Sequence, residues 1–411
     1  MFATTVLSYV LLAIAVTANP IVVRENLIRL PFAKQVNLTG ASHVLKIDQA
    51  RAAAFRAFGQ AKASGSLKSD AVISVGVQNQ AVTYVASVGV GSPATTFSLL
   101  IDTGSSNTWV GAGTAYKQTS TSTKTKDSVS VTYGSGEFSG TEFTDQVTLG
   151  SGLTIPKQSI GVASQSQGFD GVDGILGIGP VDLTSGTLSP DTSATIPTVT
   201  DNLFSRKTIT ANEIGISFEP TTQAVANNGE LTFGGTDSSK FTGSISFTPI
   251  TTTFPSSLFW GINQSIRYGS SNTILSTTAG IVDTGTTLVL IASDAFSKYT
   301  KANGAVLDNT TGLFKLTTAQ FKNLQSLFFI VGSKSFELTA NAQAWPRSLN
   351  TLIGGTTTNV YLIVADIGAN SGSGLDFING FAFLERFYSV FDTANKRVGF
   401  ATTPFTKATT N

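Results

Sequence analysis

Two aspartates stand in matching surroundings far apart in the chain. Asp102 lies within "LIDTGSSNTWV", residues 100–110, and Asp283 lies within "IVDTGTTLVL", residues 281–290. In both places an apolar run leads into Asp-Thr-Gly and resumes a few residues later. An ionised carboxylate is rarely buried without compensation, so each aspartate needs a partner. Because the whole frame is repeated, we expect two related halves that bring the two carboxyl groups face to face.

A close pair of carboxyl groups has a defined chemistry. The two groups cannot both ionise easily, so they share one proton. One group can then accept a proton from water while the other protonates a carbonyl oxygen, which together hydrolyse a peptide bond. The alternative is that both motifs are structural turns, since Asp, Thr and Gly are also good turn residues.

The residues beside the two aspartates suit a supporting role. Glycine allows the two loops to approach closely, threonine can bond across to the opposite loop, and a hydroxyl can hold the outer carboxylate oxygen. The residues expected to support the pair are Thr103, Gly104, Ser105, Thr284, Gly285 and Thr286.

The composition excludes several other kinds of active site. The chain has no cysteine and one histidine, His43, so thiol chemistry, disulfides and cysteine-ligated metals are impossible. His43 falls in a segment that we expect to be removed, which also excludes a Ser-His-Asp triad or a histidine-bound zinc. We expect no metal and no cofactor. Charged residues make up 12% of the chain and the net charge is +1, so no nucleic-acid partner is expected.

The first 70 residues are predicted to be a leader. Residues 1–18 have a short apolar centre ending in small residues, as in a secretory signal peptide, with a membrane anchor as the alternative. Residues 19–70 carry eight Lys or Arg against three acids, a charge of +5, whereas the remainder carries −4. Apolar residues in 42–64 fall at helical spacing. We interpret 19–70 as a basic inhibitory pro-segment, with an integral N-terminal subdomain as the alternative.

The rest of the chain is predicted to be mainly β. Short runs of alternating β-branched and aromatic residues are separated by Gly, Pro, Ser and Asp, and helical patterns are few, near residues 293–303 and 317–327. A later apolar segment follows each aspartate, at 170–180 and at 375–401. We expect two pseudo-twofold-related β lobes with a cleft between them, an N-terminal lobe over 71–245 and a C-terminal lobe over 246–411.

A third motif lies between the first aspartate and the segment "DGILG". In "SVTYGSGEFSG", residues 130–140, Tyr133 leads into Gly134, Ser135 and Gly136 between two strand-like runs. This pattern predicts a hairpin with a glycine-rich tip, which could close on an extended peptide as a lid.

The motifs "DTGSSNTWV", "TYGSG", "DGILG" and "VDTGTTL", in this order, resemble the pepsin-like aspartic proteases over about residues 71–405. The shared-proton mechanism is established for that family and is carried over with the resemblance. The resemblance implies that Asp102 and Asp283 are the catalytic pair and Tyr133 the flap tyrosine, with Trp109 as its hydrogen-bond partner. It also implies a pocket for the side chain before the scissile bond, lined by Leu100, Val172 and Ile175.

The resemblance further implies a secreted endopeptidase, made as a zymogen, that acts on extended peptides in acid and prefers large hydrophobic residues beside the scissile bond. We expect it to be a monomer. Some relatives carry an aspartate at the flap position of Ser135, so we expect weak cleavage after lysine here. Asn263 and Asn309 begin possible glycosylation triplets.

Two points distinguish this chain within the expected pattern. Ile378-Asn379-Gly380 has a polar residue where the family pattern has an apolar one, so packing beneath Asp283 is expected to differ.

Bases of the pro-segment are expected to pair with carboxylates of the body, and Lys34 and Lys46 are the candidates for the base over the catalytic pair. Acid should weaken this pairing and activate the enzyme.

Two other functions remain open from the sequence. A catalytically silent relative could bind peptides through the same cleft, although such proteins usually lose one of the aspartates. A glycosidase could also use two carboxyl groups in a β-rich fold.

Overall fold

The structure is a computed structural model that describes residues 27–36, 44–65, 82–134, 136–150 and 153–410. The predicted signal peptide at 1–18, His43, Ser135 and the expected boundary at residue 70 lie outside the described residues. Among the described residues, no helix is long and apolar enough to cross a membrane.

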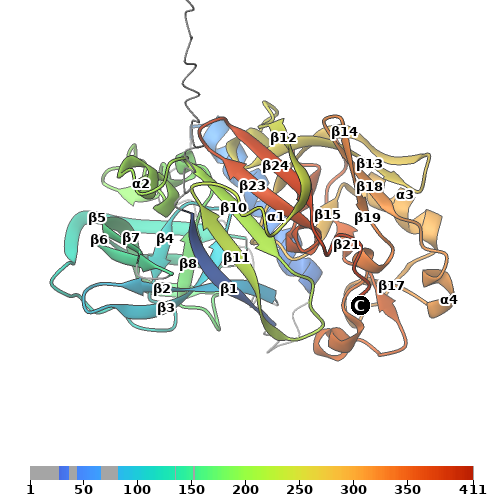
Figure 1. The fold of residues 1–411 in the computed structure, drawn as a ribbon, viewed down its shortest axis with the longest axis horizontal. Coiled ribbons are helices and arrows are strands. Elements are labelled where there is room, and N and C mark those ends of the chain that lie inside the picture. The colour runs from blue at the N-terminus through green and yellow to red at the C-terminus, as the bar shows by residue number, and fades with distance from the viewer. Residues whose placement is uncertain (1–26, 37–43, 66–81, 135, 151–152, 411) are drawn as a thin grey trace, which may run out of the picture.

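Strands dominate the architecture, as the alternating patterns predicted (Figure 1). The largest sheet contains, in spatial order, β12 (Thr242–Pro249), β24 (Arg397–Thr402), β23 (Phe387–Asp392), β10 (Glu213–Phe218), β11 (Val225–Phe233), β1 (Ile28–Val36), β2 (Val82–Val90), β3 (Thr95–Asp102), β8 (Gly174–Gly177), β4 (Thr108–Val110), β7 (Leu153–Gln167), β6 (Gly136–Leu149), β5 (Thr123–Tyr133) and β9 (Leu188–Ser189).

The second half of the chain builds two further sheets. One runs β19 (Lys334–Leu338), β18 (Leu327–Val331), β13 (Gly261–Tyr268), β14 (Asn272–Val282), β22 (Phe377–Asn379), β15 (Val289–Ile291) and β21 (Val364–Asp366), and the other runs β16 (Val306–Leu307), β17 (Phe314–Leu316) and β20 (Val360–Tyr361). Residue 245, the expected lobe boundary, lies within β12, which pairs with β24.

Helices are few and short apart from one. They are α1 (Val44–Ala63), α2 (Val199–Ser205), α3 (Ser293–Asn303), α4 (Thr318–Phe321) and α5 (Phe381–Leu384), with 3-10 turns at Val181–Thr184, Ser256–Leu258, Asn341–Gln343 and Arg347–Ile353. The helix expected near 293–303 is α3, which ends at Gly304 in the left-handed conformation. The helix expected over 317–327 ends at Phe321, because Leu327 already belongs to β18, which pairs with β13 and β19.

The two halves repeat one local plan around the aspartates. β3, which ends at Asp102, pairs in parallel with β8, and β14, which leads to Asp283, pairs in parallel with β22. In each half a short strand after the Asp-Thr-Gly turn then pairs antiparallel with that same partner, β4 with β8 and β15 with β22. This repeated pairing is the structural form of the internal duplication predicted from the sequence.

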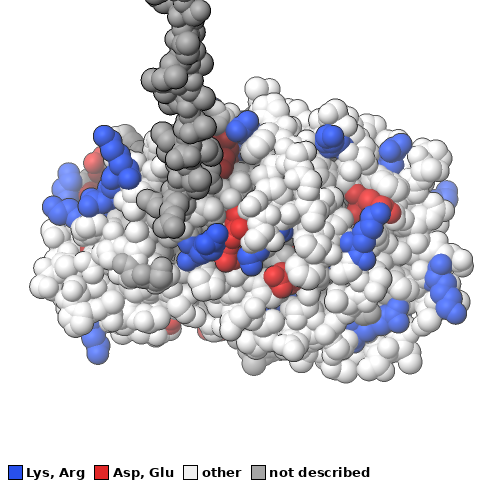
Figure 2. Space-filling model, viewed as in Figure 1, with Lys and Arg blue, Asp and Glu red and all other residues white. Residues whose placement is uncertain are grey.

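Residues of the basic segment are built into the molecule. β1 lies between β11 and β2 in the largest sheet, and its Leu30 and Phe32 are buried. The predicted helix of this segment is α1, which lies between the two halves of the molecule in Figure 1. Charged side chains on the face shown in Figure 2 are scattered, with neither sign gathered into a continuous tract.

A buried acid on β6 links stability of the fold to pH. Glu142 is buried, and burial raises its pKa to about 7, although Ser159 Oγ donates to it at 2.5 Å. A raised carboxyl pKa means that the folded chain holds a proton that the unfolded chain releases. The protonated form stabilises the fold below about pH 4.5, and this stability is lost as the pH rises towards 7.

We therefore predict that Glu142→Gln reduces the loss of stability between pH 5 and pH 8, by up to about 3 kcal/mol, because the amide cannot ionise. Urea unfolding of the full chain at several pH values measures the effect. Glu137→Gln, which changes a half-exposed carboxylate of the same strand, is the matched control. Equal pH dependence in Glu142→Gln and the unmodified chain would contradict the prediction.

Candidate active site

The two aspartates meet at the centre of the molecule. Both side chains are fully buried, with 0% exposure. A Cβ atom added to Gly104 would lie 2.6 Å from Asp283 Oδ1, and one added to Gly285 would lie 2.6 Å from Asp102 Oδ1. Each loop therefore presents its glycine to the carboxylate of the other loop, and a side chain at either glycine would separate them.

The threonines beside the aspartates join the two loops. The Thr103 amide donates to Thr284 Oγ1 at 3.0 Å, and the Thr284 amide donates to Thr103 Oγ1 at 2.9 Å. Each hydroxyl also donates across the interface, Thr103 to the Val282 carbonyl at 3.3 Å and Thr284 to the Ile101 carbonyl at 3.0 Å. These four bonds fix the position of one aspartate relative to the other.

The carboxylate oxygens are held in the same way in both halves. Ser105 Oγ donates to Asp102 Oδ2 and Thr286 Oγ1 donates to Asp283 Oδ2, each at 2.6 Å. The amides of Gly104 and Gly285 donate to the Oδ1 atoms of Asp102 and Asp283, at 2.9 and 3.1 Å. All six residues expected to support the pair therefore contact it or its opposite loop.

Arg51 of α1 lies between the two carboxylates. Its Nε donates to Asp283 Oδ2 at 2.7 Å, and one terminal nitrogen donates to Asp102 Oδ1 at 2.5 Å and to Asp283 Oδ1 at 3.1 Å. The guanidinium is 3% exposed. A planar fork of this kind can contact two carboxylates at once, which a single ammonium group does less well.

The expectation that Lys34 or Lys46 covers the pair is wrong. Lys34 is buried elsewhere, where its Nζ donates to Glu385 Oε1 at 2.8 Å. Lys46 is exposed on α1, whose buried face carries Ile47, Asp48, Arg51 and Phe55. Helical spacing therefore turns Lys46 away from the aspartates and turns Arg51 towards them.

The two aspartates differ in their electrostatic surroundings. Burial raises the pKa of Asp102, and the charge of Asp283 adds to this effect, so that Arg51 and the bond from Ser105 only partly offset it. Burial also acts to raise the pKa of Asp283, but the charge of Arg51 and its hydrogen bonds outweigh burial and hold this pKa below its usual value. In this state Asp283 is the stronger acid of the pair.

The predicted flap hairpin consists of β5 and β6, with Tyr133 paired to Gly136 at the tip. Trp109 Nε1 donates to the Tyr133 hydroxyl at 3.0 Å, which is the bond implied by the family resemblance. Tyr133 packs edge-on against Phe169, and Trp109 stacks on Phe138. Tyr133 is therefore held by the same apolar cluster that contains the predicted pocket residues.

The predicted pocket residues come together in this cluster. Leu100, Val172 and Ile175 are all buried and pack in one apolar group with Trp109 and Tyr133. Their side chains come from β3, the loop before β8 and β8 itself, which lie beside each other because β3 pairs with β8. They are buried within this cluster and are not among the residues that line the cavity beside Tyr133, which include Phe55, Phe58 and Leu183.

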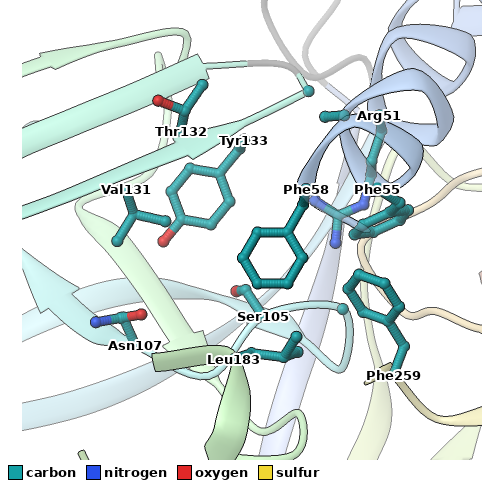
Figure 3. Close-up of a pocket in the computed structure, with 13 residues that line it drawn as sticks. Arg51, Phe55, Phe58, Ser105, Asn107, Val131, Thr132, Tyr133, Leu183 and Phe259 are labelled. Atoms are coloured by element: carbon teal, nitrogen blue, oxygen red, sulfur yellow. The ribbon is translucent and has the colours of Figure 1, made fainter. Parts of the chain in front are cut away.

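Helix α1 runs through the space between flap and aspartates. A Cβ added to Gly134 would lie 2.0 Å from Arg51 Cα, so the flap tip rests directly on the helix backbone. Phe55 packs edge-on against Phe259 with ring centres 4.8 Å apart, and Phe58 and Leu183 line the cavity beside them (Figure 3). The helix thus fills the space between the flap tip and the aspartates.

The polar residue in Ile378-Asn379-Gly380 has a buried partner. Asn379 Nδ2 donates to Gln264 Oε1 at 2.9 Å, and Gln264 Nε2 donates back to Asn379 Oδ1 at 3.1 Å. Both residues are fully buried, and the Asn379 carbonyl accepts from the Asp283 amide at 3.2 Å. At the corresponding place in the first half, Leu176 pairs with Ile101. Packing beneath Asp283 therefore differs from packing beneath Asp102, as expected.

Comparison with known proteins identifies the family. The family described as eukaryotic aspartyl protease matches residues 83–403. The chain belongs to the eukaryotic aspartyl proteases. It is 72% identical over 338 residues to polyporopepsin of Irpex lacteus, covering 82% of this chain and 99% of that protein. It is 32% identical over 323 residues to gastricsin of Cavia porcellus, covering 74% and 76% of the two chains.

A solved structure shows the same fold. The crystal structure of the aspartic proteinase from Irpex lacteus matches with a TM-score of 0.79 and 73% identity, covering 80% of this chain and 96% of that one. The prediction of a mainly β, bilobal, pepsin-like fold is therefore confirmed. This chain is an aspartic-type endopeptidase, a hydrolase whose substrates are peptides. Among the described residues, no group of three or more His, Cys, Asp or Glu is placed to hold a metal ion.

Two residues of this site were missed from the sequence. Arg51 interrupts the apolar series Val44, Ile47 and Phe55 at helical spacing, and a charge in the apolar face of a helix indicates a buried partner. Gln264 gave no such signal, because its partner Asn379 is 115 residues away.

The hydrogen-bonded amides of Asn379 and Gln264, beneath Asp283, lead to a prediction about the free energy of unfolding. Asn379→Leu or Gln264→Leu alone should each cost about 1–3 kcal/mol, because each leaves a buried amide without a partner. The double variant should recover most of this loss, since it places two apolar side chains together. A double-mutant cycle from urea unfolding measures the coupling. Additive losses in the double variant would show that the two amides do not depend on each other.

Proposed function

We propose that the chain is the zymogen of a secreted aspartic endopeptidase that acts in acid, with Asp102 and Asp283 as its catalytic pair. The observation that supports this most directly is the mirrored support of the two carboxyl groups. Each accepts from a hydroxyl at 2.6 Å and from a glycine amide, and both meet at a single point occupied by Arg51.

Once α1 leaves, the space of the Arg51 guanidinium can hold a water molecule between the two carboxyl groups. One carboxylate accepts a proton from this water as the water oxygen bonds to the carbonyl carbon of the peptide. The other carboxyl group donates its proton to the carbonyl oxygen. The first carboxyl group then gives the proton it took from water to the peptide nitrogen, the carbon–nitrogen bond breaks, and the second carboxylate takes a proton back from a hydroxyl of the tetrahedral carbon, which becomes the new carboxylic acid. Burial favours a shared proton, because two adjacent negative charges are costly in the interior.

The flap and pocket support a preference for large hydrophobic side chains. Leu100, Val172 and Ile175 carry no charge and pack with Tyr133 in one apolar cluster. An apolar pocket discriminates by the size and hydrophobicity of the side chain that fills it. Tyr133 can close over an extended peptide in the space that α1 now fills.

The contacts of the basic segment support an inhibitory role. Three of its bases pair with acids of the body: Arg29 with Asp237 at 2.8 Å, Lys34 with Glu385 at 2.8 Å, and Arg51 with both aspartates. Together, β1 and α1 fill a place in the central sheet and the cleft. Removal of the segment is therefore required before a substrate can reach Asp102 and Asp283.

The lowered pKa of Asp283 gives this inhibition a dependence on acid. If docking lowers the pKa of a carboxyl group, the ionised group stabilises the docked state at pH values above its ordinary pKa of 3.8. That stabilisation is lost as the pH falls through the lowered value, because protonated Asp283 no longer attracts Arg51. We therefore propose that the segment is released in strong acid.

Secretion through residues 1–18, glycosylation at the exposed residues Asn263 and Asn309, and a monomeric state are parts of the same proposal.

The catalytic assignment predicts the effect of removing either acid. Asp102→Asn and Asp283→Asn should each lower kcat on a protein substrate by about 10³-fold or more, because neither variant can share a proton between two carboxyl groups. Digestion of haemoglobin at about pH 3 measures this. Asp191→Asn, at an exposed carboxylate, is the control and should keep full activity. An active Asp283→Asn enzyme would contradict the proposed function.

The role assigned to Arg51 predicts a change in activation. Arg51→Gln should raise the pH at which half of the chain becomes active by about one unit or more, because the charge that opposes protonation of Asp283 is absent. Activity after a fixed incubation between pH 2.5 and pH 6 measures this midpoint. Arg56→Gln removes a charge from the same helix without touching the aspartates and should leave the midpoint in place. An unchanged midpoint in Arg51→Gln would exclude this role.

A further inference from the structure

A third carboxyl group is buried beside the two aspartates. Asp48 lies on α1, one turn before Arg51, and is 1% exposed. Its Oδ1 accepts from the Thr287 amide at 3.2 Å and its Oδ2 accepts from the Leu288 amide at 2.7 Å. These two amides belong to the loop that follows Asp283. The helix therefore contacts the catalytic loop of the second half through a carboxyl group as well as through Arg51.

The inhibited centre contains more acid than base. Asp48, Asp102 and Asp283 are all buried, and Arg51 is the cation that acts on each of them. If all three acids were ionised, one guanidinium would leave two negative charges uncompensated in the interior. Charges buried without a partner are costly, so docking of the helix favours the uptake of a proton.

The groups around Asp48 indicate where that proton is held. Arg51 on its own helix and Asp283 on the loop beneath it act on Asp48 through their charges. Lys34, Glu385 and Arg386 lie around a small cavity that Thr287 also lines, and Lys34 is already paired with Glu385. Arg51 donates hydrogen bonds to Asp102 and Asp283, whereas the hydrogen bonds to Asp48 come from two uncharged amides, so Asp48 is the acid with the least direct compensation. In accord with this, burial raises the pKa of Asp48 to about 7, and the two amides and Arg51 only partly oppose this rise.

We propose that Asp48 is the group that takes up a proton when the helix docks, and that α1 is therefore held more tightly in mild acid than at neutral pH. This inference rests on the proposed inhibitory role of the basic segment. It assigns to the amides of Thr287 and Leu288 a second docking site, distinct from the contact of Arg51 with the aspartates.

The direction of the effect follows from linkage. A carboxyl group with a raised pKa in the docked state strengthens docking as the pH falls from about 7 to about 4. Because docking takes up one proton, the equilibrium constant for docking of α1 rises by up to about tenfold for each unit by which the pH falls in this range. Below about pH 4 the opposite effect of Asp283 takes over and docking weakens. The helix is thus held most tightly in mild acid, just above the range in which the segment is released.

The experiment compares the unprocessed full chain with the mature enzyme at each pH between 4.5 and 7. A fluorescent statine-type transition-state analogue is the probe, because it needs the space that α1 occupies. The ratio of its Kd for the unprocessed chain to its Kd for the mature enzyme reports how rarely the cleft is open. This ratio also cancels the pH dependence of the analogue itself, and gel electrophoresis shows that processing has not begun.

For the unmodified chain, the ratio should rise by up to about tenfold per unit as the pH falls from 7 to 5. Asp48→Asn cannot ionise and should give a ratio that is flat over this range. Asp48→Glu keeps a titrating group and should keep the rise, which retains a test if Asp48→Asn does not fold. Asp191→Asn, at an exposed carboxylate, should behave as the unmodified chain.

Three results would overturn the inference: a flat ratio in the unmodified chain, a ratio that falls between pH 7 and pH 5, or the same rise in Asp48→Asn. Failure of the proposed function looks different. In that case the analogue would bind the unprocessed chain and the mature enzyme equally at every pH, or the mature enzyme would not digest protein.

Discussion

The structure depends on compensating two buried carboxylates at one point. Asp102 and Asp283 are fully buried, and Arg51 is the cation that contacts both. Buried acids of like charge repel each other and lose hydration, so a fold that brings them together requires a cation or a shared proton. In this structure Arg51 supplies the cation. The proposed active enzyme uses the proton and a water molecule in the same place.

The scaffold makes this arrangement possible through its internal repeat. Parallel pairing of β3 with β8 and of β14 with β22 brings each aspartate to the same edge of its half, and the crossed bonds of Thr103 and Thr284 join the edges. The two halves are not identical, because amides lie beneath Asp283 where apolar side chains lie beneath Asp102. Asp48 and Arg51 add a further asymmetry, since Asp48 contacts the second loop and Arg51 makes two hydrogen bonds to Asp283 but one to Asp102.

Much of this could be predicted from the sequence because the signals are local. The Asp-Thr-Gly motifs, the Tyr133 hairpin and helix 293–303 each follow from residue types within a few positions. The base over the aspartates could not be predicted from charge, because Lys34, Lys46 and Arg51 are all bases of the same segment. Which base faces the cleft depends on helical phase, and the phase of Arg51 matches that of Ile47 and Phe55. The pairing of Gln264 with Asn379 depends on distant strands and has no local signal.

The most direct test is a crystal structure of the unprocessed chain near pH 7. It should show the Arg51 guanidinium between the two carboxylates, with its Nε on Asp283 and a terminal nitrogen on Asp102, and with Tyr133 bonded to Trp109. A structure in which Arg51 points away from the cleft, with water between Asp102 and Asp283, would contradict the account of charge compensation.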